Sequence, residues 1–126
     1  MNKIIINSSK APEPLGPYSQ AVMVNDTLYL SGQIAIDQSK GSMVNGSIQK
    51  ETHQVMKNIS FVLEAAGLNF TNVVKCSIFI KDMNDFKAIN EEYGKFFDSS
   101  PPARETVEVS RLPKDVNVEI SCIAVK

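Results

Sequence analysis

The longest helical periodicity in the chain covers residues 47–66, where apolar side chains recur at three- and four-residue steps. The positions in this stripe are Ile48, Val55, Met56, Ile59, Val62, Leu63 and Ala66. Gly67 follows at once, and glycine is the usual residue at the left-handed position that ends a helix. The pattern therefore predicts one amphipathic helix that stops at Gly67.

A second helical pattern follows Asp82 or Asn84, either of which can cap a first turn. Its predicted inner face carries Phe86, Ile89, Tyr93 and Phe97. Serines and prolines at residues 99–102 end it, because proline cannot continue a helix.

Short apolar runs bounded by turn residues predict the strands. Their expected ranges are 3–6, 20–24, 27–36, 73–80, 105–110 and 116–125. Asn25 and Asp26 join the second and third ranges, and both residue types tolerate the positive φ of a tight hairpin. Residues 37–46 are rich in Ser, Gly and Asn and predict a loop.

These elements follow the order β-ββ-α-β-α-ββ, which predicts an α+β fold with a mixed β-sheet and both helices packed on one face. Alternation would place Val74, Cys76, Ile78 and Ile80 on the helix-covered face. The open face would keep Val73, Phe79, Ile123 and Val125. Self-association is the simplest cover for these apolar groups, and a half-solvated antiparallel sheet is the alternative. The length of 126 residues predicts a single domain, 1–126.

The composition of the chain limits the kinds of partner that the protein is expected to bind. The net charge is −1 and no basic run occurs, which argues against nucleic acid as the main partner. No apolar stretch approaches the length of a membrane span, and the opening residues fall short of a secretory signal.

Cys76 and Cys122 lie on the apolar side of predicted strands, so we expect buried free thiols and a reducing, cytoplasmic location. The single histidine, His53, has no cysteine near it in sequence, so no metal site is expected.

Arg104 is the leading candidate for ligand binding. It follows Pro101, Pro102 and Ala103 where a loop becomes a strand, and only two of the thirteen basic residues are arginines. A guanidinium can bind a carboxylate through two parallel hydrogen bonds, whereas an ammonium cannot. The alternative is a surface arginine paired with Glu105 or Glu108.

Glu119 is the second candidate. It lies opposite the apolar row of the last strand, on the face that the helices leave open. A carboxylate that shares a cleft with an anion-binding arginine can orient a water for attack on a carboxylated substrate. A glutamate on an open sheet face can equally be just solvated.

Gly32 interrupts an apolar strand with a residue that has no side chain. A glycine in such a place is expected where a ligand or another backbone comes close, and a β-bulge is the alternative.

Further motifs surround these residues. Their order along the chain is Gly16–Ala21, Ser31–Gln33, Asn90 with Tyr93, Pro102–Arg104, and Leu112–Asp115 with Val118–Ile120. This order closely resembles the reactive-intermediate deaminase family, also called the YjgF or liver perchloric-acid-soluble protein family. The resemblance covers essentially the whole chain, and GPYSQA and PPAR are its most specific segments.

The resemblance implies a chorismate-mutase-like fold and a homotrimer with active sites between adjacent subunits. It implies hydrolysis of enamines and imines, such as 2-aminoacrylate, 2-iminopropanoate and 2-iminobutanoate, to 2-keto acids and ammonia without any cofactor. Arg104 would then clamp the substrate carboxylate, and Glu119 would position the attacking water. The implied substrate-binding positions are Tyr18, Ser31, Gly32, Asn90, Arg104 and Thr106.

Two positions depart from the pattern of relatives. Many relatives carry a cysteine where Thr106 stands, so thiol-based regulation is not expected there. Ser121 replaces an acidic residue common in relatives, which alters the polarity of the open face.

Two other functions compete with deamination. An endoribonuclease or translation inhibitor would need paired titrating groups and a phosphate track, and the chain offers one histidine and no basic groove. A non-catalytic trimer that binds small carboxylates would use the same arginine.

Overall fold

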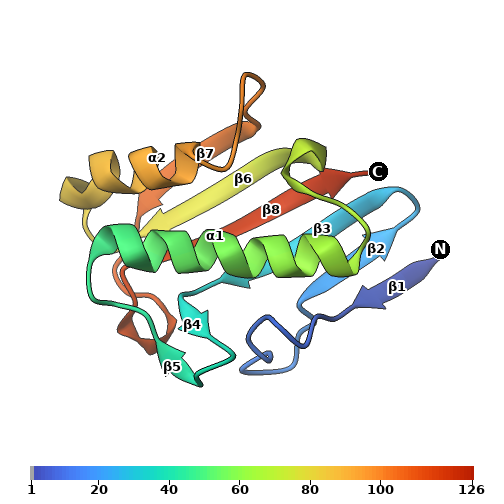
Figure 1. Cartoon of the computed structure of the whole chain (residues 1–126), viewed down its shortest axis with the longest axis horizontal. Helices are drawn as coiled ribbons and strands as arrows, with labels where there is room; N and C mark the ends of the chain where they lie inside the picture. Colours follow the sequence, from blue (N-terminus) through green and yellow to red (C-terminus); the bar gives the residue numbers. More distant parts are fainter. Residues whose placement is uncertain (1) are drawn as a thin grey trace.

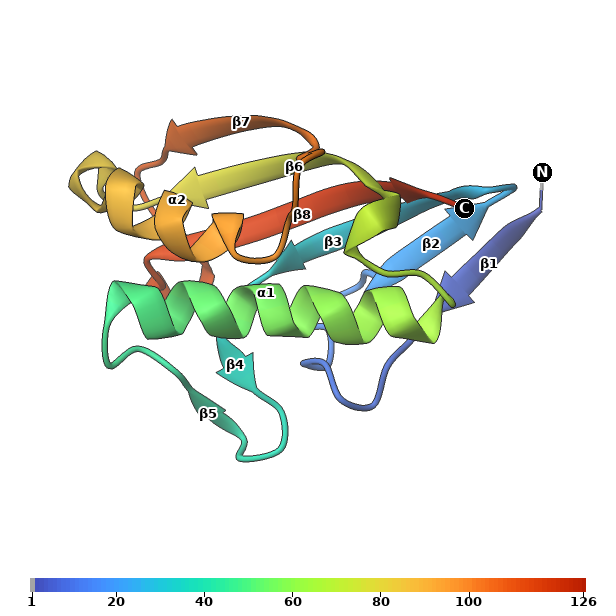
Figure 2. The same ribbon diagram turned by 45° about the horizontal axis from the view of Figure 1, so that its top comes forward.

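The structure is a computed structural model that describes residues 2–126, in which two helices cover one face of a six-stranded sheet (Figures 1 and 2). In spatial order the strands are β1 (Lys3–Ile6), β2 (Ala21–Val24), β3 (Thr27–Gln33), β8 (Val118–Val125), β6 (Val73–Ile80) and β7 (Ala103–Glu108). Strands β6 and β7 pair in parallel, and the other neighbours in this sheet are antiparallel. The predicted α+β class, with a mixed sheet and both helices on one side, is confirmed.

Helix α1 (Ile48–Ala65) begins at Ser47, whose side-chain oxygen accepts a hydrogen bond from the backbone N–H of Lys50 at 3.1 Å. Gly67 adopts φ of 75°, the left-handed conformation expected of it. The apolar stripe of α1 packs onto the sheet with the inward residues of β3, β6 and β8 to form the core. The largest fully buried apolar side chains include Leu28, Met56, Ile59, Leu63, Ile78, Ile80, Ile89 and Ile120.

The predicted strand 27–36 and the predicted loop 37–46 are both partly wrong. A register shift between Leu30 and Gln33 disrupts the pairing of β3 with β8, and β3 ends at Gln33. The chain then turns away from the main sheet and forms a small hairpin of β4 (Ile36–Asp37) and β5 (Ser42–Met43). The period-two pattern could not show where the strand leaves the sheet.

Strict alternation also fails at the start of β6. A register shift between Val73 and Lys75 leaves Val74 without a partner on β8. Val73 is therefore buried in the core, whereas Val74 is 49% exposed, the reverse of the prediction for both residues.

The second helix begins later than predicted. Asp82 caps a short 3-10 turn, η2 (Met83–Asp85), and α2 (Phe86–Gly94) follows. Ile89 and Tyr93 are buried as predicted, but Phe86 is 37% exposed because it stands at the first position of α2. Two other 3-10 turns, η1 (Phe70–Asn72) and η3 (Pro113–Asp115), precede β6 and β8. The second of these explains why β8 starts at Val118 rather than at residue 116.

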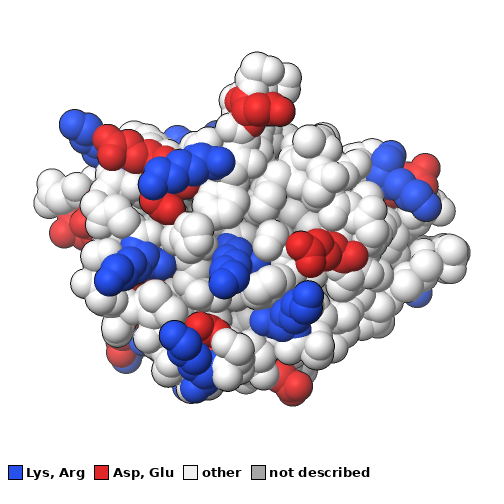
Figure 3. Space-filling model, viewed as in Figure 1, with Lys and Arg blue, Asp and Glu red and all other residues white. Residues whose placement is uncertain are grey.

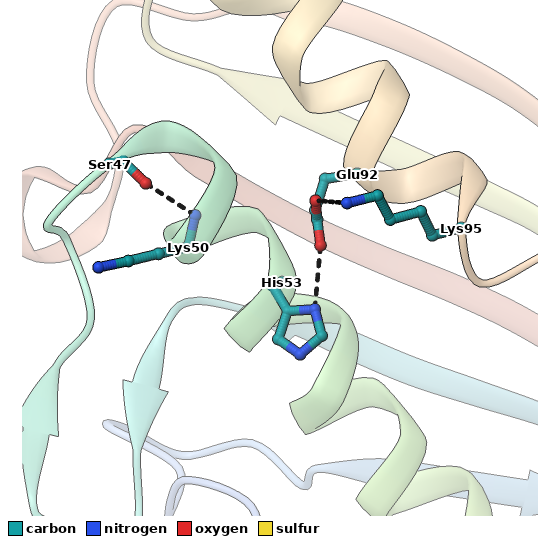
Figure 4. Close-up of polar contacts among 5 residues, drawn as sticks. All are labelled: Ser47, Lys50, His53, Glu92 and Lys95. Carbon is teal, nitrogen blue, oxygen red and sulfur yellow. Dashed lines mark hydrogen bonds and ion pairs between the residues drawn. The ribbon is translucent and has the colours of Figure 1, made fainter.

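A polar contact between His53 and Glu92 joins the two helices (Figure 4). The buried carboxylate of Glu92 on α2 contacts His53 Nδ1 of α1 at 3.0 Å and accepts a hydrogen bond from Lys95 Nζ at 2.8 Å. The Lys95 hydrogen bond, followed by that of His53, holds the pKa of Glu92 below its usual value although burial opposes this. The His53 contact links α2 to α1, whereas the Lys95 contact lies within the last turn of α2.

Cys76 and Cys122 are free, buried and directly opposite each other on β6 and β8, which confirms the prediction of buried free thiols. Burial is the main cause that raises the pKa of both thiols. On the helix-covered face, acidic and basic side chains are interspersed and separated by wide uncharged areas (Figure 3). Among residues 2–126, no helix has both the length and the apolar character needed to cross a bilayer.

Candidate active site

Arg104 lies on the edge strand β7 and extends its side chain over α2. Its Nη1 donates a hydrogen bond to Asn90 Oδ1 at 2.7 Å. The guanidinium carbon lies 5.1 Å from the ring centre of Tyr93 and 5.8 Å from that of Phe86. Both distances are in the range of cation–π contacts. One face of α2, with residues at positions i, i+4 and i+7, therefore forms a cradle for Arg104.

The alternative salt bridges expected for Arg104 do not form. Glu105 contacts Lys75 Nζ at 2.6 Å and also accepts a hydrogen bond from Ser77. Glu108 accepts a hydrogen bond from the backbone N–H of Met83 at 2.7 Å. In the described part of the chain no carboxylate pairs with Arg104. Among the described residues, the guanidinium of Arg104 contacts an amide oxygen and two aromatic rings. This environment suits a side chain that binds an anion.

Thr106 and Tyr93 add two hydroxyl groups beside Arg104. Thr106 is two residues further along β7 and so lies on the same face as Arg104. The buried Oγ1 of Thr106 has no hydrogen-bond partner among residues 2–126, whereas the buried hydroxyl of Tyr93 lies beside the Cys76 thiol. Buried polar atoms are normally paired, so an unpaired hydroxyl two residues from Arg104 is unusual. Burial is the main cause that raises the pKa of Tyr93, and its phenol stays neutral.

Glu119 lies on the other face of the sheet, next to Gly32 of the neighbouring strand β3. A Cβ atom at Gly32 would stand 2.8 Å from Glu119 Cδ, closer than real Cβ atoms approach another group. Only glycine leaves room for this carboxylate. Of the two alternatives for Gly32, the register shift between Leu30 and Gln33 supports the bulge, and the group that approaches the glycine is a side chain of the same chain rather than a ligand or another backbone. Burial raises the pKa of Glu119 above its usual value of 4.5.

A small hollow of about 40 Å³ opens beside Glu119, with room for about one water molecule. Its lining includes Pro12, Leu15, Tyr18, Ile34, Pro113 and Glu119. The Tyr18 hydroxyl accepts a hydrogen bond from the backbone N–H of Leu15 at 3.0 Å, which fixes the ring at the hollow. Ser31, on β3, donates from Oγ to the carbonyl of Ser19 at 2.6 Å. Ser31 thus holds the segment that carries Tyr18.

The candidate residues fall into two groups. We define the arginine half-site as Phe86, Asn90, Tyr93, Arg104 and Thr106, and the glutamate half-site as Tyr18, Ser31, Gly32 and Glu119. The arginine half-site faces α2, on the side of the sheet where Val118 and Ile120 are buried. Glu119 stands between those two residues on β8 and points to the opposite face. One chain therefore does not bring Arg104 and Glu119 into one cleft.

Sequence reasoning missed the contact of Phe86 and Tyr93 with Arg104. It placed both rings in the core, although their spacing of four and three residues from Asn90 could have indicated a shared face. In the described ranges, His, Cys, Asp and Glu side chains do not gather in groups of three that could hold a metal ion. Independence from cofactors remains a prediction.

Comparison with known proteins identifies the family. The family model described as Endoribonuclease L-PSP matches residues 8–126, and the chain belongs to this family. A RutC family protein of Pyrococcus horikoshii is 50% identical over 124 residues, which are 98% of each chain. The human 2-iminobutanoate/2-iminopropanoate deaminase is 46% identical over 122 residues, 97% of this chain and 89% of that one.

A solved structure shows the same fold. The crystal structure of E. coli TdcF with bound serine has a TM-score of 0.93 to this chain at 39% identity, with 98% of each chain covered. The family resemblance read from the sequence motifs is thereby confirmed.

Proposed function

We propose that this protein hydrolyses small enamines and imines that carry a carboxylate, such as 2-aminoacrylate, 2-iminopropanoate and 2-iminobutanoate, to 2-keto acids and ammonia. We further propose that it works as a homotrimer of one-domain protomers. In this trimer, the arginine half-site of one protomer faces the glutamate half-site of the next. The observation that carries this proposal is the location of Arg104 and Glu119 on opposite faces of one sheet, so that a shared cleft needs a second copy.

The relatives support the substrate class. A human relative at 46% identity is named as a deaminase of two 2-imino acids. TdcF binds serine, an amino acid whose carboxylate an arginine can grip. The exposed apolar residues on the open face, among them Tyr29 and Val125, support a protein cover for that face.

The two half-sites divide the chemistry. Arg104 binds the substrate carboxylate with the guanidinium edge that Asn90 leaves free, and the Thr106 hydroxyl adds a donor. An enamine first takes a proton from solvent at its β-carbon and becomes the protonated imine. Water then adds to the carbon of this protonated imine while Glu119 accepts the proton of the water. Glu119 returns that proton to the amine nitrogen of the carbinolamine, which leaves as ammonia, and takes up the hydroxyl proton as the ketone forms. Burial raises the pKa of the Glu119 carboxyl, which makes it a stronger base than an exposed glutamate and a group that can accept this proton and return it.

The arginine clamp is tested by Arg104→Ala and Arg104→Lys, with ammonia release measured from imines generated enzymatically from several amino acids. We expect both variants to lose at least about 100-fold in kcat/KM, because an ammonium cannot reproduce the two-point grip. Folding is checked by thermal unfolding of each variant. Retained turnover in the lysine variant would refute the clamp.

The shared cleft is tested by mixing two inactive variants, Arg104→Ala and Glu119→Ala, after joint unfolding and refolding. If each site draws one half from each of two protomers, random assembly restores about one quarter of the sites. Native mass spectrometry verifies that hybrids form. Hybrids that form but stay inactive would contradict the shared cleft.

The same variants distinguish deamination from the two alternative functions, carboxylate binding without turnover and RNA cleavage. A carboxylate-binding protein without turnover would bind 2-keto acids but release no ammonia from any imine. Enzyme in which Glu119 is replaced by Ala should keep binding and lose turnover, as judged by calorimetry beside the activity assay. Because the family description names an endoribonuclease, RNA digestion is measured with the wild type and the Arg104→Ala variant in parallel.

A further inference from the structure

Glu51 is a buried carboxylate that the proposed chemistry does not use. It lies in the first turn of α1 and is only 1% exposed. Its Oε2 accepts the backbone N–H of Asn117 at 2.8 Å, and its Oε1 accepts Asn117 Nδ2 at 2.8 Å. Across residues 2–126 it has no ion pair with a Lys, Arg or His side chain. A buried charge without a counter-ion depends on its hydrogen bonds, so this two-point contact is specific.

Asn117 stands immediately before β8 and two residues before Glu119. Its carbonyl accepts the backbone N–H of Lys81 at 3.0 Å, so its backbone N–H, its carbonyl and its side chain are all held. Both bonds from Glu51 reach across 66 positions of the sequence, from the helix layer to the start of a central strand.

The turn before Asn117 is strained. Lys114 and Asp115 adopt φ of 58° and 55°, a left-handed conformation that is unfavourable for lysine and better tolerated by aspartate. Arg111 Nε donates to Asp115 Oδ1 at 2.7 Å and braces the turn from its exposed side. Pro113, in the same turn, lines the hollow beside Glu119. Glu51 secures the end of this turn from the interior.

We propose that Glu51 is a positioning residue that, through Asn117, fixes the start of β8 and thereby holds the Glu119 carboxylate over Gly32. This inference rests on the proposed function for its catalytic consequence. Without an acceptor at residue 51, the N–H of Asn117 is unpaired and the strained turn can relax. Glu119 and Pro113 then shift together, and a displacement of about 1 Å at a reacting group can lower a rate by about 100-fold.

The test exchanges the two partners. In Glu51→Gln a side-chain NH2 replaces one of the two carboxylate oxygens, each of which accepts from one donor of Asn117. In Asn117→Asp two carboxylates face each other. In the double variant Glu51→Gln/Asn117→Asp, the new amide can donate to the new carboxylate while its oxygen accepts the backbone N–H of residue 117. The pairing of donors and acceptors is therefore restored with the charge moved across the contact.

We expect each single variant to lower kcat by about 10-fold or more with KM changed less than about two-fold, and the double variant to recover most of kcat. Ile59→Ala, a fully buried position on the same helix, serves as the stability control. It should lower the melting temperature and leave kcat unchanged. Glu51→Gln with an unchanged kcat, or a folded double variant without recovery, would overturn the inference.

A second measurement does not depend on activity. The 13C resonance of the Glu119 carboxyl should move in both single variants and return in the double variant. If the wild type releases no ammonia from imines, the proposed function fails, and this resonance alone decides whether Glu51 positions Glu119. If Glu51→Gln does not fold, Asn117→Ala keeps the backbone bond, removes the side-chain bond, and is judged by the same criteria.

Discussion

The two half-sites hold their charged groups in contrasting ways. Arg104 is surrounded by partners from a single helix face: an amide oxygen at 2.7 Å and two aromatic rings. Glu119 lies over a glycine, and burial raises its pKa. The arginine half-site thus preserves a fixed charge, whereas the glutamate half-site makes its charge easy to neutralise. This contrast suits a clamp on one side and a proton carrier on the other.

Their supports differ as well. The arginine half-site joins an edge strand, β7, to α2, which is itself held on α1 by Glu92 (Figure 4). The glutamate half-site lies mainly on the central strands β3 and β8, where Glu119 pairs with Phe79 of β6, although the register shift between Leu30 and Gln33 interrupts the pairing at Ser31 and Gly32. We therefore expect changes around Arg104 to affect binding first and changes around Glu119 to affect the rate first.

The largest effect is expected from Gly32→Ala. The new Cβ would lie 2.8 Å from Glu119 Cδ, so the carboxylate must leave its place, and we expect kcat to fall by about 100-fold or more. Gly94→Ala is the matched control, because a Cβ atom at that position would meet nothing within 4 Å. Steady-state kinetics of both variants give the result, and equal activity of the two would contradict the assigned role of Gly32.

An effect of about 10-fold is expected from Tyr93→Leu, which removes a cation–π contact worth about 0.5–2 kcal/mol from Arg104. The loss should fall mainly on KM. Tyr93→Phe keeps the ring and should restore KM, while Phe97→Leu removes a ring that packs 4.9 Å from Tyr93 and should lower stability only. If KM rises equally in the Tyr93→Phe variant, the ring is not what orients Arg104.

A smaller effect is expected on the pKa of Glu119, because the proposed trimer brings the two half-sites together. Burial raises the pKa of Glu119, and a guanidinium arriving from a neighbouring protomer would lower it. We therefore expect Arg104→Ala to raise the pKa of Glu119 relative to the wild type, as measured by 13C titration of the carboxyl. A carboxyl whose pKa is higher in the folded than in the unfolded state stabilises the fold at low pH, and this stabilisation is lost as the pH rises through the folded-state pKa. The Arg104→Ala variant should therefore lose more free energy of unfolding than the wild type between acidic and neutral pH. Identical titrations would argue against the shared cleft.

The smallest effect is expected from Glu92→Gln, which loosens α2 beneath the arginine half-site alone. Because Lys95 and His53 are largely exposed, the loss in unfolding free energy should be about 0.5–1 kcal/mol. The pKa of Glu92 is lowered, so its contribution is present at neutral pH and is lost as the pH falls through that value. Thermal unfolding at neutral and acidic pH checks this, and KM should rise by less than about two-fold while kcat stays unchanged.

Most of the fold could be predicted from local pattern. The apolar stripe of α1 follows from the spacing of its side chains. The end of the helix at Gly67 follows from backbone geometry that the nearby residues alone determine. The errors lie where pairing between distant strands shifts register. Val74 was assigned to the core and is exposed, and the strand expected to run to Ile36 leaves the sheet after Gln33. A register shift depends on two strands at once, and neither sequence segment shows it.

For the site, the sequence determined which residue types are available: an arginine shortly after two prolines, a glutamate on the open face of the last strand, and a glycine in an apolar strand. The tertiary structure decided how they combine. It placed the carboxylate of Glu119 over Gly32, stacked Arg104 on α2, and put these two groups on opposite faces of the sheet. Strand alternation is local and can be read from the chain, whereas contacts between elements arise only when the layers pack.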